Sequence, residues 1–478
     1  MSDGTREEAF FYRLPKGIKE ITVGKYKLDP VAVAPVHTRY RTIRTPIPVP
    51  ESVPILQSLA ESEPQSMAGQ PPILWHRAEG FQVWDRWGNC WIDWSSGVLI
   101  TNAGHGRPEI REALKAIIDQ GLLCTYVFPH EKRVELVRML QDISPDPAAY
   151  HVFLLSTGSE ATENCIKLAK TYALEKYGRQ KKYFLSFRNS FHGRTLGAQL
   201  AGGMDKLKRW IVDEGQTFIQ VPFPDGYKNP DTSFDLLRQT LDRVQVKPQD
   251  IAGMMTESYQ GVGPDFLPEE YARQLDHFCK ENDIVTIFDE VQSGFGRTGR
   301  MFAFEHYGVK PDLIACGKGI SSSLPIAAVI GRKEIMSLYP PGSMTSTHSA
   351  SPLPVVSAIE SLKLIQREGL VERAASLGGI LVPEVHRIQR KYPSVLGCAQ
   401  GRGLVAGIQA VRPGTREPDS ELAQAINERC LQKGLLMFAP VGVGGECLKI
   451  APPLVITEDA LRESLSVFEE ACDDVLGR

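Results

Sequence analysis

The sequence lacks the patterns that identify several large classes of protein. Its 478 residues carry a formal net charge of −3 and no cluster of Lys and Arg, which argues against nucleic acid as a partner. The nine cysteines are scattered, with no CxxC or Cys/His ligand spacing. We therefore expect neither disulfides nor a metal site, and take the reducing cytoplasm as the compartment.

Long apolar runs are also missing. No stretch of roughly 18 uncharged apolar residues is present, so we expect no membrane span. The N-terminal residues, MSDGTREEAFFYRLPKG, lack the apolar core of a secretory signal. Hydrophobic residues make up 42% of the chain, which suits two or three sub-domains with a large core. We interpret residues 1–50, rich in Pro, Arg and Lys without clear periodicity, as an extended arm.

Local patterns predict several elements of secondary structure. Alternating apolar residues on both sides of residues 85–89 predict a hairpin, with Gly88 and Asn89 at positive φ. Helical spacing of apolar residues predicts helices over 109–121, 131–143 and 421–433. The glycines of GRGLVAGIQ suggest one bent strand. His105, between two glycines, is interpreted as a residue that fixes a loop.

Two charged residues stand where short apolar runs end: Asp289 after DIVTIF and Lys318 after DLIAC. Such runs indicate strands buried on both faces, and open α/β sheets bind ligands at strand ends. A lysine amine condenses with an aromatic aldehyde to a Schiff base, and a carboxylate keeps a facing pyridine nitrogen protonated. The pair predicts pyridoxal phosphate chemistry. The ordinary alternative is a turn-capping Asp289 and a solvated Lys318.

The residues around this pair form a longer pattern. It comprises Phe288, Asp289, Glu290, Val291, Gly294, Asp312, Leu313, Gly317 and Lys318. This pattern resembles the signature of the class III pyridoxal-phosphate-dependent aminotransferases, which act on 4-aminobutyrate, ornithine and ω-amino acids. The GxGxxG at 294–299 opens no helix directly after a strand, so a dinucleotide-binding loop is disfavoured.

The resemblance implies an α/β protein of fold type I. Its large domain is expected to hold a mixed, mostly parallel seven-stranded sheet, beside a smaller α+β domain built from both chain ends. We expect an N-terminal extension over 1–50, the first part of the small domain over 51–97, the large domain over 98–345 and the rest of the small domain over 346–478.

The segment STGSEA, 156–161, joins an apolar run to a predicted helix with acidic residues in its first turn. Free amides and the helix dipole at such a start bind anions. Taken alone, the pattern is usually an N-cap. With Asp289 and Lys318 downstream, we favour a phosphate loop of Thr157, Gly158 and Ser159, where the resemblance also places it.

The resemblance assigns further residues to the site. Phe191 is expected to stack on the cofactor ring and Arg194 to bind a substrate carboxylate, with a core Phe191 and a surface-paired Arg194 as the alternatives. Apart from the resemblance, Tyr126, between two predicted helices, is expected to line the substrate pocket or to serve ordinary packing. The remaining residues assigned to the cofactor are His192, Glu257, Val291 and Gln292.

Two positions depart from the family pattern. Val262 stands where the 4-aminobutyrate branch has a gating glutamate, and Lys449 stands where a carboxylate-binding arginine is expected. An apolar side chain cannot neutralise a cation, and lysine lacks the bidentate fork of arginine. The dual-specificity mechanism of that branch is therefore in doubt here.

The turn at 345–352 carries the last expectation. The resemblance implies a homodimer, with a tetramer as the alternative, in which Thr347 reaches the partner subunit's phosphate. Ser351 replaces the usual Asn before Pro352, and the wording THSASPLP is closer to the dialkylglycine decarboxylase and amino-acid epimerase branches.

The leading functional hypothesis is transfer of an amino group from an amine or (ω-)amino acid to a keto acid such as pyruvate or 2-oxoglutarate. Lys318 is expected to act as general base and acid in it. The alternatives are an epimerase or a decarboxylating aminotransferase using the same Lys318 and Asp289, and a pyridoxal-binding protein without turnover.

Overall fold

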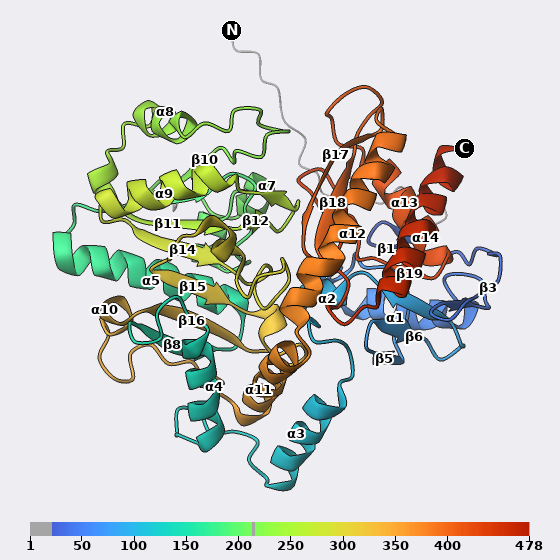
Figure 1. Ribbon diagram of the computed structural model, residues 1–478, viewed down its shortest axis with the longest axis horizontal. Helices are drawn as coiled ribbons and strands as arrows, with labels where there is room; N and C mark the ends of the chain where they lie inside the picture. The colour runs from blue at the N-terminus through green and yellow to red at the C-terminus, as the bar shows by residue number, and fades with distance from the viewer. Residues whose placement is uncertain (1–21, 213–215, 478) are drawn as a thin grey trace.

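The computed structural model describes residues 22–212 and 216–477, and the first 21 residues of the predicted arm lie outside them. The chain forms a larger body around one wide sheet and a smaller body that contains residues from both ends of the chain (Figure 1). In the part of the chain that the structure describes, no helix combines the length and apolar character needed to cross a membrane.

The wide sheet arises from short apolar runs in which successive side chains point to opposite faces. Its seven strands are β8 (Tyr150–Leu155), β9 (Tyr183–Phe187), β10 (Phe218–Val221), β11 (Ile251–Glu257), β14 (Val285–Asp289), β15 (Leu313–Cys316) and β16 (Ala327–Arg332). Leu154, Met254 and Phe288 belong to one buried cluster, while Leu155, Met255 and Ile287 belong to another. Both faces are therefore covered.

The strand order is β10-β9-β11-β14-β15-β16-β8. Neighbours from β10 to β15 run parallel, and β16 is antiparallel to both β15 and β8. The predicted mixed, mostly parallel seven-stranded sheet is confirmed. Its register aligns Glu257 with Asp289 and Asp289 with Ala315, so the ends of three adjacent strands present their residues at one edge.

Helices cover the two faces of this sheet. Helix α5 packs against β8, β11, β14, β15 and β16 from one side, while α4 and α9 contribute to the cluster on the other side. The helices of this body are α3 (Pro108–Asp119), α4 (Glu131–Asp142), α5 (Gly158–Tyr177), α6 (Leu196–Ala201), α7 (Asp205–Lys208), α8 (Asp235–Arg243), α9 (Glu269–Glu281), α10 (Lys333–Met336) and α11 (Pro352–Arg367), with 3-10 turns at Pro248–Asp250, Ala303–Tyr307 and Lys318–Ile320.

The smaller body contains a six-stranded and a three-stranded sheet. The first comprises β3 (Val36–His37), β4 (Thr42–Ile43), β5 (Arg77–Glu79), β6 (Gln82–Trp84), β7 (Cys90–Asp93) and β19 (Leu435–Leu436). The second comprises β17 (Leu396–Arg402), β18 (Val405–Ala410) and β20 (Cys447–Ile450). Its helices are α1 (Val53–Ser62), α2 (Ser96–Leu99), α12 (Leu370–Lys391), α13 (Ser420–Gln432) and α14 (Glu458–Leu476), with 3-10 turns at Pro50–Ser52 and Gln65–Met67.

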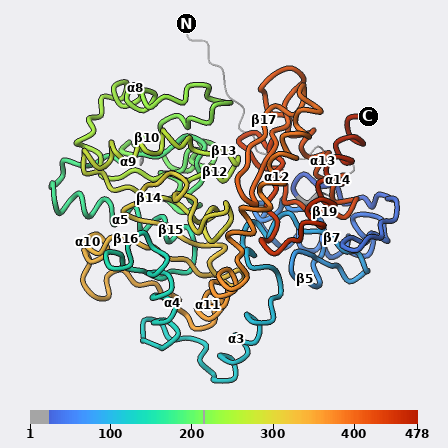
Figure 2. The backbone as a smooth tube through the Cα atoms, in the orientation of Figure 1, coloured from blue at the N-terminus to red at the C-terminus, as the bar shows by residue number. Residues whose placement is uncertain are grey.

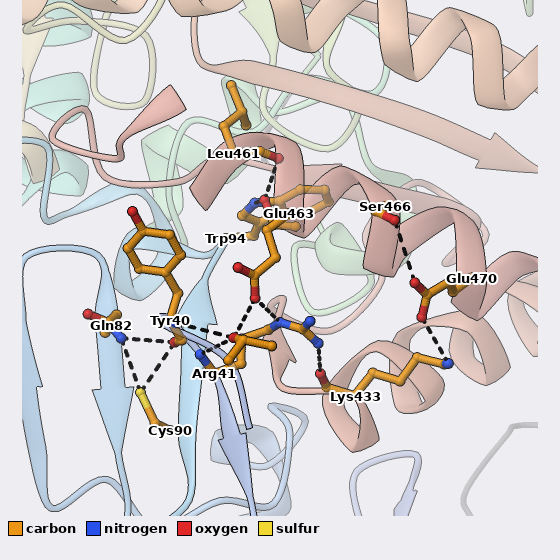
Figure 3. Close-up of polar contacts among 12 residues, drawn as sticks. Tyr40, Arg41, Gln82, Cys90, Trp94, Lys433, Leu461, Glu463, Ser466 and Glu470 are labelled. Carbon is orange, nitrogen blue, oxygen red and sulfur yellow. Dashed lines mark hydrogen bonds and ion pairs between the residues drawn. The ribbon is translucent and has the colours of Figure 1, made fainter. Parts of the chain in front are cut away.

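The described part of the predicted arm is packed rather than extended. After the short pair β1 (Thr22–Val23) and β2 (Tyr26–Lys27), strands β3 and β4 join the six-stranded sheet. Arg41 ties this segment to the C-terminal region, with Nε 2.7 Å from Glu463 Oε1 and a guanidinium nitrogen 2.5 Å from the Lys433 carbonyl (Figure 3). The blue and red ends of the tube accordingly lie together (Figure 2).

Most of the local predictions hold. Strands β6 and β7 form the predicted hairpin, although Gly88 adopts positive φ and Asn89 does not. Helices α3, α4 and α13 occupy the predicted ranges. The prediction of a single bent strand was wrong. Gly403, at φ 60°, lies in the turn between two antiparallel strands, β17 and β18. An added Cβ there would meet the Thr298 backbone at 2.4 Å, so only glycine fits this turn.

Candidate active site

A small cavity of about 150 Å³ opens at the edge where β11, β14 and β15 end. It is lined by Thr157, Gly158, Ser159, Phe191, His192, Gly193, Glu257, Asp289, Val291, Gln292 and Lys318. Every residue that the sequence assigned to the cofactor is present except Thr347. Five separate segments supply these residues, each at or after the end of one strand (β8, β9, β11, β14 or β15). The sheet brings the segments together because these strands end at one edge.

Lys318 follows β15 in a constrained backbone conformation. Its φ is 41°, unusual for a residue with a side chain, while the preceding Gly317 is extended. Burial lowers the pKa of the Lys318 amine, and the charges of Asp289 and Glu257 oppose that shift. A lysine with a lowered pKa supplies more of the neutral amine, the nucleophilic form.

Asp289 is the last residue of β14 and is buried. Its Oδ1 accepts a hydrogen bond from the Val291 amide at 3.1 Å, and its Oδ2 lies 2.8 Å from His192 Nδ1. Because an ionised carboxylate only accepts, His192 Nδ1 is the donor. The other ring nitrogen of His192 is buried and has no hydrogen-bond partner among the described residues. These two donors fix the carboxylate in one orientation.

The start of α5 forms a cradle of backbone amides. Thr157 is the N-cap: its hydroxyl accepts from the Glu160 amide at 3.2 Å, and Glu160 Oε2 accepts from the Thr157 amide at 2.9 Å. This capping box leaves the Gly158 and Ser159 amides, which have no intrahelical acceptor, for an anion. Glycine is required at 158 because an added Cβ would lie 2.8 Å from Val291 Cγ1.

Glu257 holds two further segments of the wall. Its carboxylate accepts from the Phe191 amide at 3.0 Å and from the Gly261 amide at 2.7 Å. Burial raises the pKa of Glu257 to about 7, and the charge of Asp289 adds to the rise. Phe191 lines the cavity rather than the core, and the Arg194 guanidinium lies 5.5 Å from its ring centroid. Arg194 is exposed and forms no ion pair within the described ranges.

A second cavity of about 600 Å³ adjoins the first and shares Phe191 and Gln292 with it. Its charged lining residues are Arg194, Asp205, Lys206 and Lys449. Most of the rest is apolar and comes from several loops: Val98, Leu99, Met204, Leu207, Val262, Phe438, Val441 and Val443. The arrangement suits a molecule with an apolar body and an acidic end.

Lys449 belongs to the wall of this second cavity but is only 1% exposed. Its Nζ donates to the Gly261 carbonyl at 2.8 Å and to Gln292 Oε1 at 2.9 Å. Burial lowers the pKa of Lys449 to about 8. The sequence placed Lys449 at the position of a carboxylate-binding arginine, where its amine would face the substrate. The structure instead shows an amine largely occupied by protein acceptors.

Comparison with known proteins identifies the family to which this chain belongs. A family model described as aminotransferase class-III matches residues 65–472. The chain belongs to the class III aminotransferases. It is 33% identical over 406 residues to an acetylornithine aminotransferase of Caldanaerobacter subterraneus subsp. tengcongensis, covering 84% of this chain and 95% of that protein. It is also 30% identical over 424 residues to an alanine/serine racemase of Pyrococcus horikoshii, covering 85% and 86%.

Solved structures agree. An aminotransferase from Bacillus anthracis superposes with a TM-score of 0.79 at 28% identity, covering 89% of this chain and 99% of that one. As a class III aminotransferase, the protein is an enzyme that transfers amino groups with pyridoxal phosphate. This sets aside a pyridoxal-binding protein without turnover. The cradle at Gly158, the Lys318 amine that follows β15 and the oriented Asp289 fit that cofactor.

Two predicted site residues lie outside both cavities of this aminotransferase. Thr347 is exposed in the turn that precedes α11. Tyr126 is 40% exposed, and its hydroxyl lies 2.9 Å from Thr345 Oγ1 in the same turn. Within the described chain, Thr347 does not line the cavity that contains Lys318, and Tyr126 does not line the larger cavity beside it.

Sequence reasoning also missed part of the site. It did not identify the apolar wall formed by Val98, Phe438, Val441 and Val443, nor Lys206 at its rim. The segment GVGGE after Val441 carried a turn signal, which marks a loop but not the cavity that the loop faces.

Proposed function

We propose that Lys318 carries pyridoxal phosphate as a Schiff base and that the enzyme moves an amino group from an amine or (ω-)amino acid to a keto acid such as pyruvate or 2-oxoglutarate. The observation that carries the proposal is the meeting of Lys318, the oriented Asp289 and the free start of α5 in one cavity.

The cofactor, when bound, supplies an aldehyde that captures amines and a protonated ring that withdraws electrons from the substrate. The chain's own residues do the rest. Asp289, held by His192 and Val291, places its negative charge for the ring nitrogen. The α5 amides would hold the phosphate, and Phe191 would offer its ring as a stacking partner for the cofactor. Lys318 Nζ, once free, accepts the proton from the substrate's Cα.

Borohydride reduction tests the Lys318 assignment. The purified protein should be yellow, and reduction should fix the cofactor on the peptide that bears Lys318. Lys318→Ala should abolish this and slow the proton transfer by several orders of magnitude, because the covalent and acid–base roles both vanish. Asp289→Ala should bind the cofactor weakly and turn over poorly. Reduction onto any other lysine would contradict the assignment.

A panel of amines with pyruvate or 2-oxoglutarate identifies the substrates. A second candidate function, epimerisation, is favoured by the racemases among the relatives and by the THSASPLP turn. Incubating one amino acid with and without a keto acid separates the two functions, because transfer requires the acceptor and epimerisation does not. Loss of carbon dioxide would identify the decarboxylating alternative.

The carboxylate anchor proposed for the acceptor is Arg194. Val262 cannot mask a cation, and Lys449 is already bonded to Gly261 and Gln292. Arg194 is exposed and lines the same cavity. An acceptor with two carboxylates, such as 2-oxoglutarate, needs two cationic side chains to bind both of them. Because Arg194 is the one proposed here, pyruvate should be preferred over 2-oxoglutarate.

The proposed assembly is a homodimer, or a tetramer of two such dimers. It is supported by the exposure of Thr347 and by the placement of Tyr126 beside the same turn. In the dimer, Thr347 would reach the partner subunit's phosphate and Tyr126 would border the partner subunit's entrance. All nine cysteines are free, which supports the cytoplasm as the proposed compartment.

A further inference from the structure

The wall of the larger cavity includes two hairpin tips from distant parts of the chain. One joins β12 (Tyr259–Gln260) to β13 (Asp265–Phe266) and carries Val262. The other spans 441–447 and is closed by the Val441 and Cys447 amides, which donate to each other's carbonyls at 2.9 and 2.7 Å. Val262, Val441 and Val443 all line the cavity.

These tips meet at the border between the two bodies. Figure 1 shows β12 beside β17 and β18. The Phe266 amide donates to Gln400 Oε1 at 2.9 Å, and Cys447 Sγ lies 2.7 Å from the Gly263 carbonyl. The width of the cavity at this wall therefore depends on how the first tip is seated on the three-stranded sheet.

Lys228, from a third loop, forms ion pairs with one carboxylate at each hairpin tip. Its Nζ lies 2.9 Å from Glu446 Oε1 on one tip and 3.6 Å from Asp265 Oδ2 beside the other. Both carboxylates are almost fully buried, at 1% and 2% exposure. Their remaining oxygens are also occupied, since Glu446 Oε2 accepts from the Gly444 amide and Asp265 Oδ1 from Gln409 Nε2, both at 2.9 Å.

The charge of Lys228 is needed at this position. Among the described residues it is the only cation in an ion pair with either carboxylate. Burial alone would lower the pKa of Lys228, but Asp265 and Glu446 outweigh it and the net shift is upward. Without the ammonium, two buried carboxylates would share a space without a counter-charge, a strongly unfavourable arrangement. Moving the tips apart and admitting water would relieve it.

We propose that Lys228 is a positioning residue for the substrate cavity: its ammonium clamps the two hairpin tips and so sets the width of the wall that carries Val262 and Val443. This proposal rests on the proposed function in one respect, since it assumes that the substrate binds in this cavity. It predicts that Lys228 governs binding of donors with bulky apolar side chains, while Lys318 and Asp289 continue to act unchanged.

The first test measures the clamp without catalysis. Amide hydrogen exchange of the cofactor-loaded enzyme is compared in the wild type, Lys228→Met and Lys228→Arg. The Met variant should exchange faster in peptides covering 259–266 and 441–447 and not in peptides covering α5 or β14, and Arg should restore slow exchange. Lys280→Met, which removes an exposed pair with Asp276 on α9, is the matched control and should change neither segment. Equal exchange in wild type and Lys228→Met overturns the clamp.

The second test uses L-phenylalanine and L-alanine as donors and follows the cofactor's absorbance change in a single half-reaction. Lys228→Met should raise the apparent Kd for L-phenylalanine about tenfold and leave the limiting rate within about twofold, the scale of one lost coupling between neighbouring groups. L-Alanine, whose side chain is a single methyl group, should be affected less than about threefold. An unchanged Kd for L-phenylalanine overturns the role in the cavity.

Two safeguards keep these outcomes separate. If Lys228→Met does not fold, Lys228→Met/Glu446→Gln carries one buried negative charge fewer and is used instead. If no amine changes the wild-type absorbance, the proposed function fails, whereas hydrogen exchange still decides the clamp.

Discussion

Lys449 shows how burial changes the meaning of a residue that looks simple in sequence. A lysine in place of an arginine suggests a weaker carboxylate ligand. In the fold, its nitrogen is held by the Gly261 carbonyl and Gln292 Oε1, so its hydrogen-bonding capacity is mostly spent within the protein. The bond also turns the Gln292 oxygen toward Lys449. Arg194, exposed and unpaired within the described ranges, keeps its full set of donors.

A comparison of two variants tests this division of roles. Arg194→Ala should lower kcat/KM for carboxylate-bearing substrates by about 1.5–3 kcal/mol, the range for a hydrogen bond to a charged group. Lys449→Ala should lower it less. Steady-state kinetics with pyruvate and 2-oxoglutarate measure both. A larger loss in Lys449→Ala, or a strong wild-type preference for 2-oxoglutarate, would show that Lys449 is the principal anchor.

The pH dependence of acceptor binding follows from the same residue. Burial lowers the pKa of Lys449 to about 8, so its positive charge is present at lower pH and is lost as the pH rises through 8. The KM for pyruvate should therefore rise above about pH 8 in the wild type. In Lys449→Arg the positive charge persists above pH 8, so the rise in KM for pyruvate should disappear. If KM for pyruvate rises above pH 8 in both enzymes, a group other than Lys449 is responsible for the rise.

At the scale of elements, the site depends on how closely the start of α5 approaches the loop after β14. Gly158 opens the helix, and the space that a Cβ would need is occupied by Val291. The capping box of Thr157 and Glu160 fixes the direction of the first turn. A helix displaced by a fraction of an ångström would point its free amides away from the phosphate.

Gly158→Ala should weaken cofactor binding about tenfold or more, because the added Cβ would lie 2.8 Å from Val291 Cγ1. Gly158→Ala/Val291→Ala should recover part of the loss relative to the single variants. Gly379→Ala, in α12 with no heavy atom within 4 Å of the added Cβ, is the matched control and should bind normally. Equilibrium titration of the apoenzyme measures all four. An unaffected Gly158→Ala would contradict the close approach.

At the scale of the whole molecule, both chain ends build the smaller body. The six-stranded sheet holds β3 and β4 from one end and β19 from the other. We propose the same division as before, with the first part of the small domain over 51–97, the large domain over 98–345 and the remainder over 346–478. Helix α11 lies within that remainder in sequence but packs against α3 and α4 of the larger body. The proposed extension over 1–50 then includes the sheet residues 36–43. Thr347, exposed near one boundary, belongs functionally to a second subunit in this proposal.

Mixed dimers test the crossing of Thr347. Thr347→Ala alone should weaken cofactor binding by about 1–3 kcal/mol. When subunits carrying Lys318→Ala and Thr347→Ala are combined, one site of each mixed dimer should hold both an intact Lys318 and an intact Thr347, and tight cofactor binding should reappear there. If Thr347 acted within its own chain, no site would be intact and mixing would restore nothing.

The sequence alone determined the features that depend on local order. Short apolar runs predicted the buried strands, their polar ends placed Asp289 and Lys318, and the small residues before an acidic first turn placed the cradle at Gly158. These signals are contiguous in the chain, so periodicity and caps disclose them. The hairpin at Gly403 was missed because one glycine supports either a bend or a turn.

Only the tertiary structure decided the rest. The burial of Lys449, the capture of its amine by Gly261 and Gln292, and the meeting of Lys228 with Asp265 and Glu446 join residues far apart in the chain. No local pattern encodes such contacts, since they depend on how separate loops and sheets pack. Burial then determines the charge of each group and its partners. An amine or carboxylate removed from water must find its hydrogen-bond and ion-pair partners within the protein.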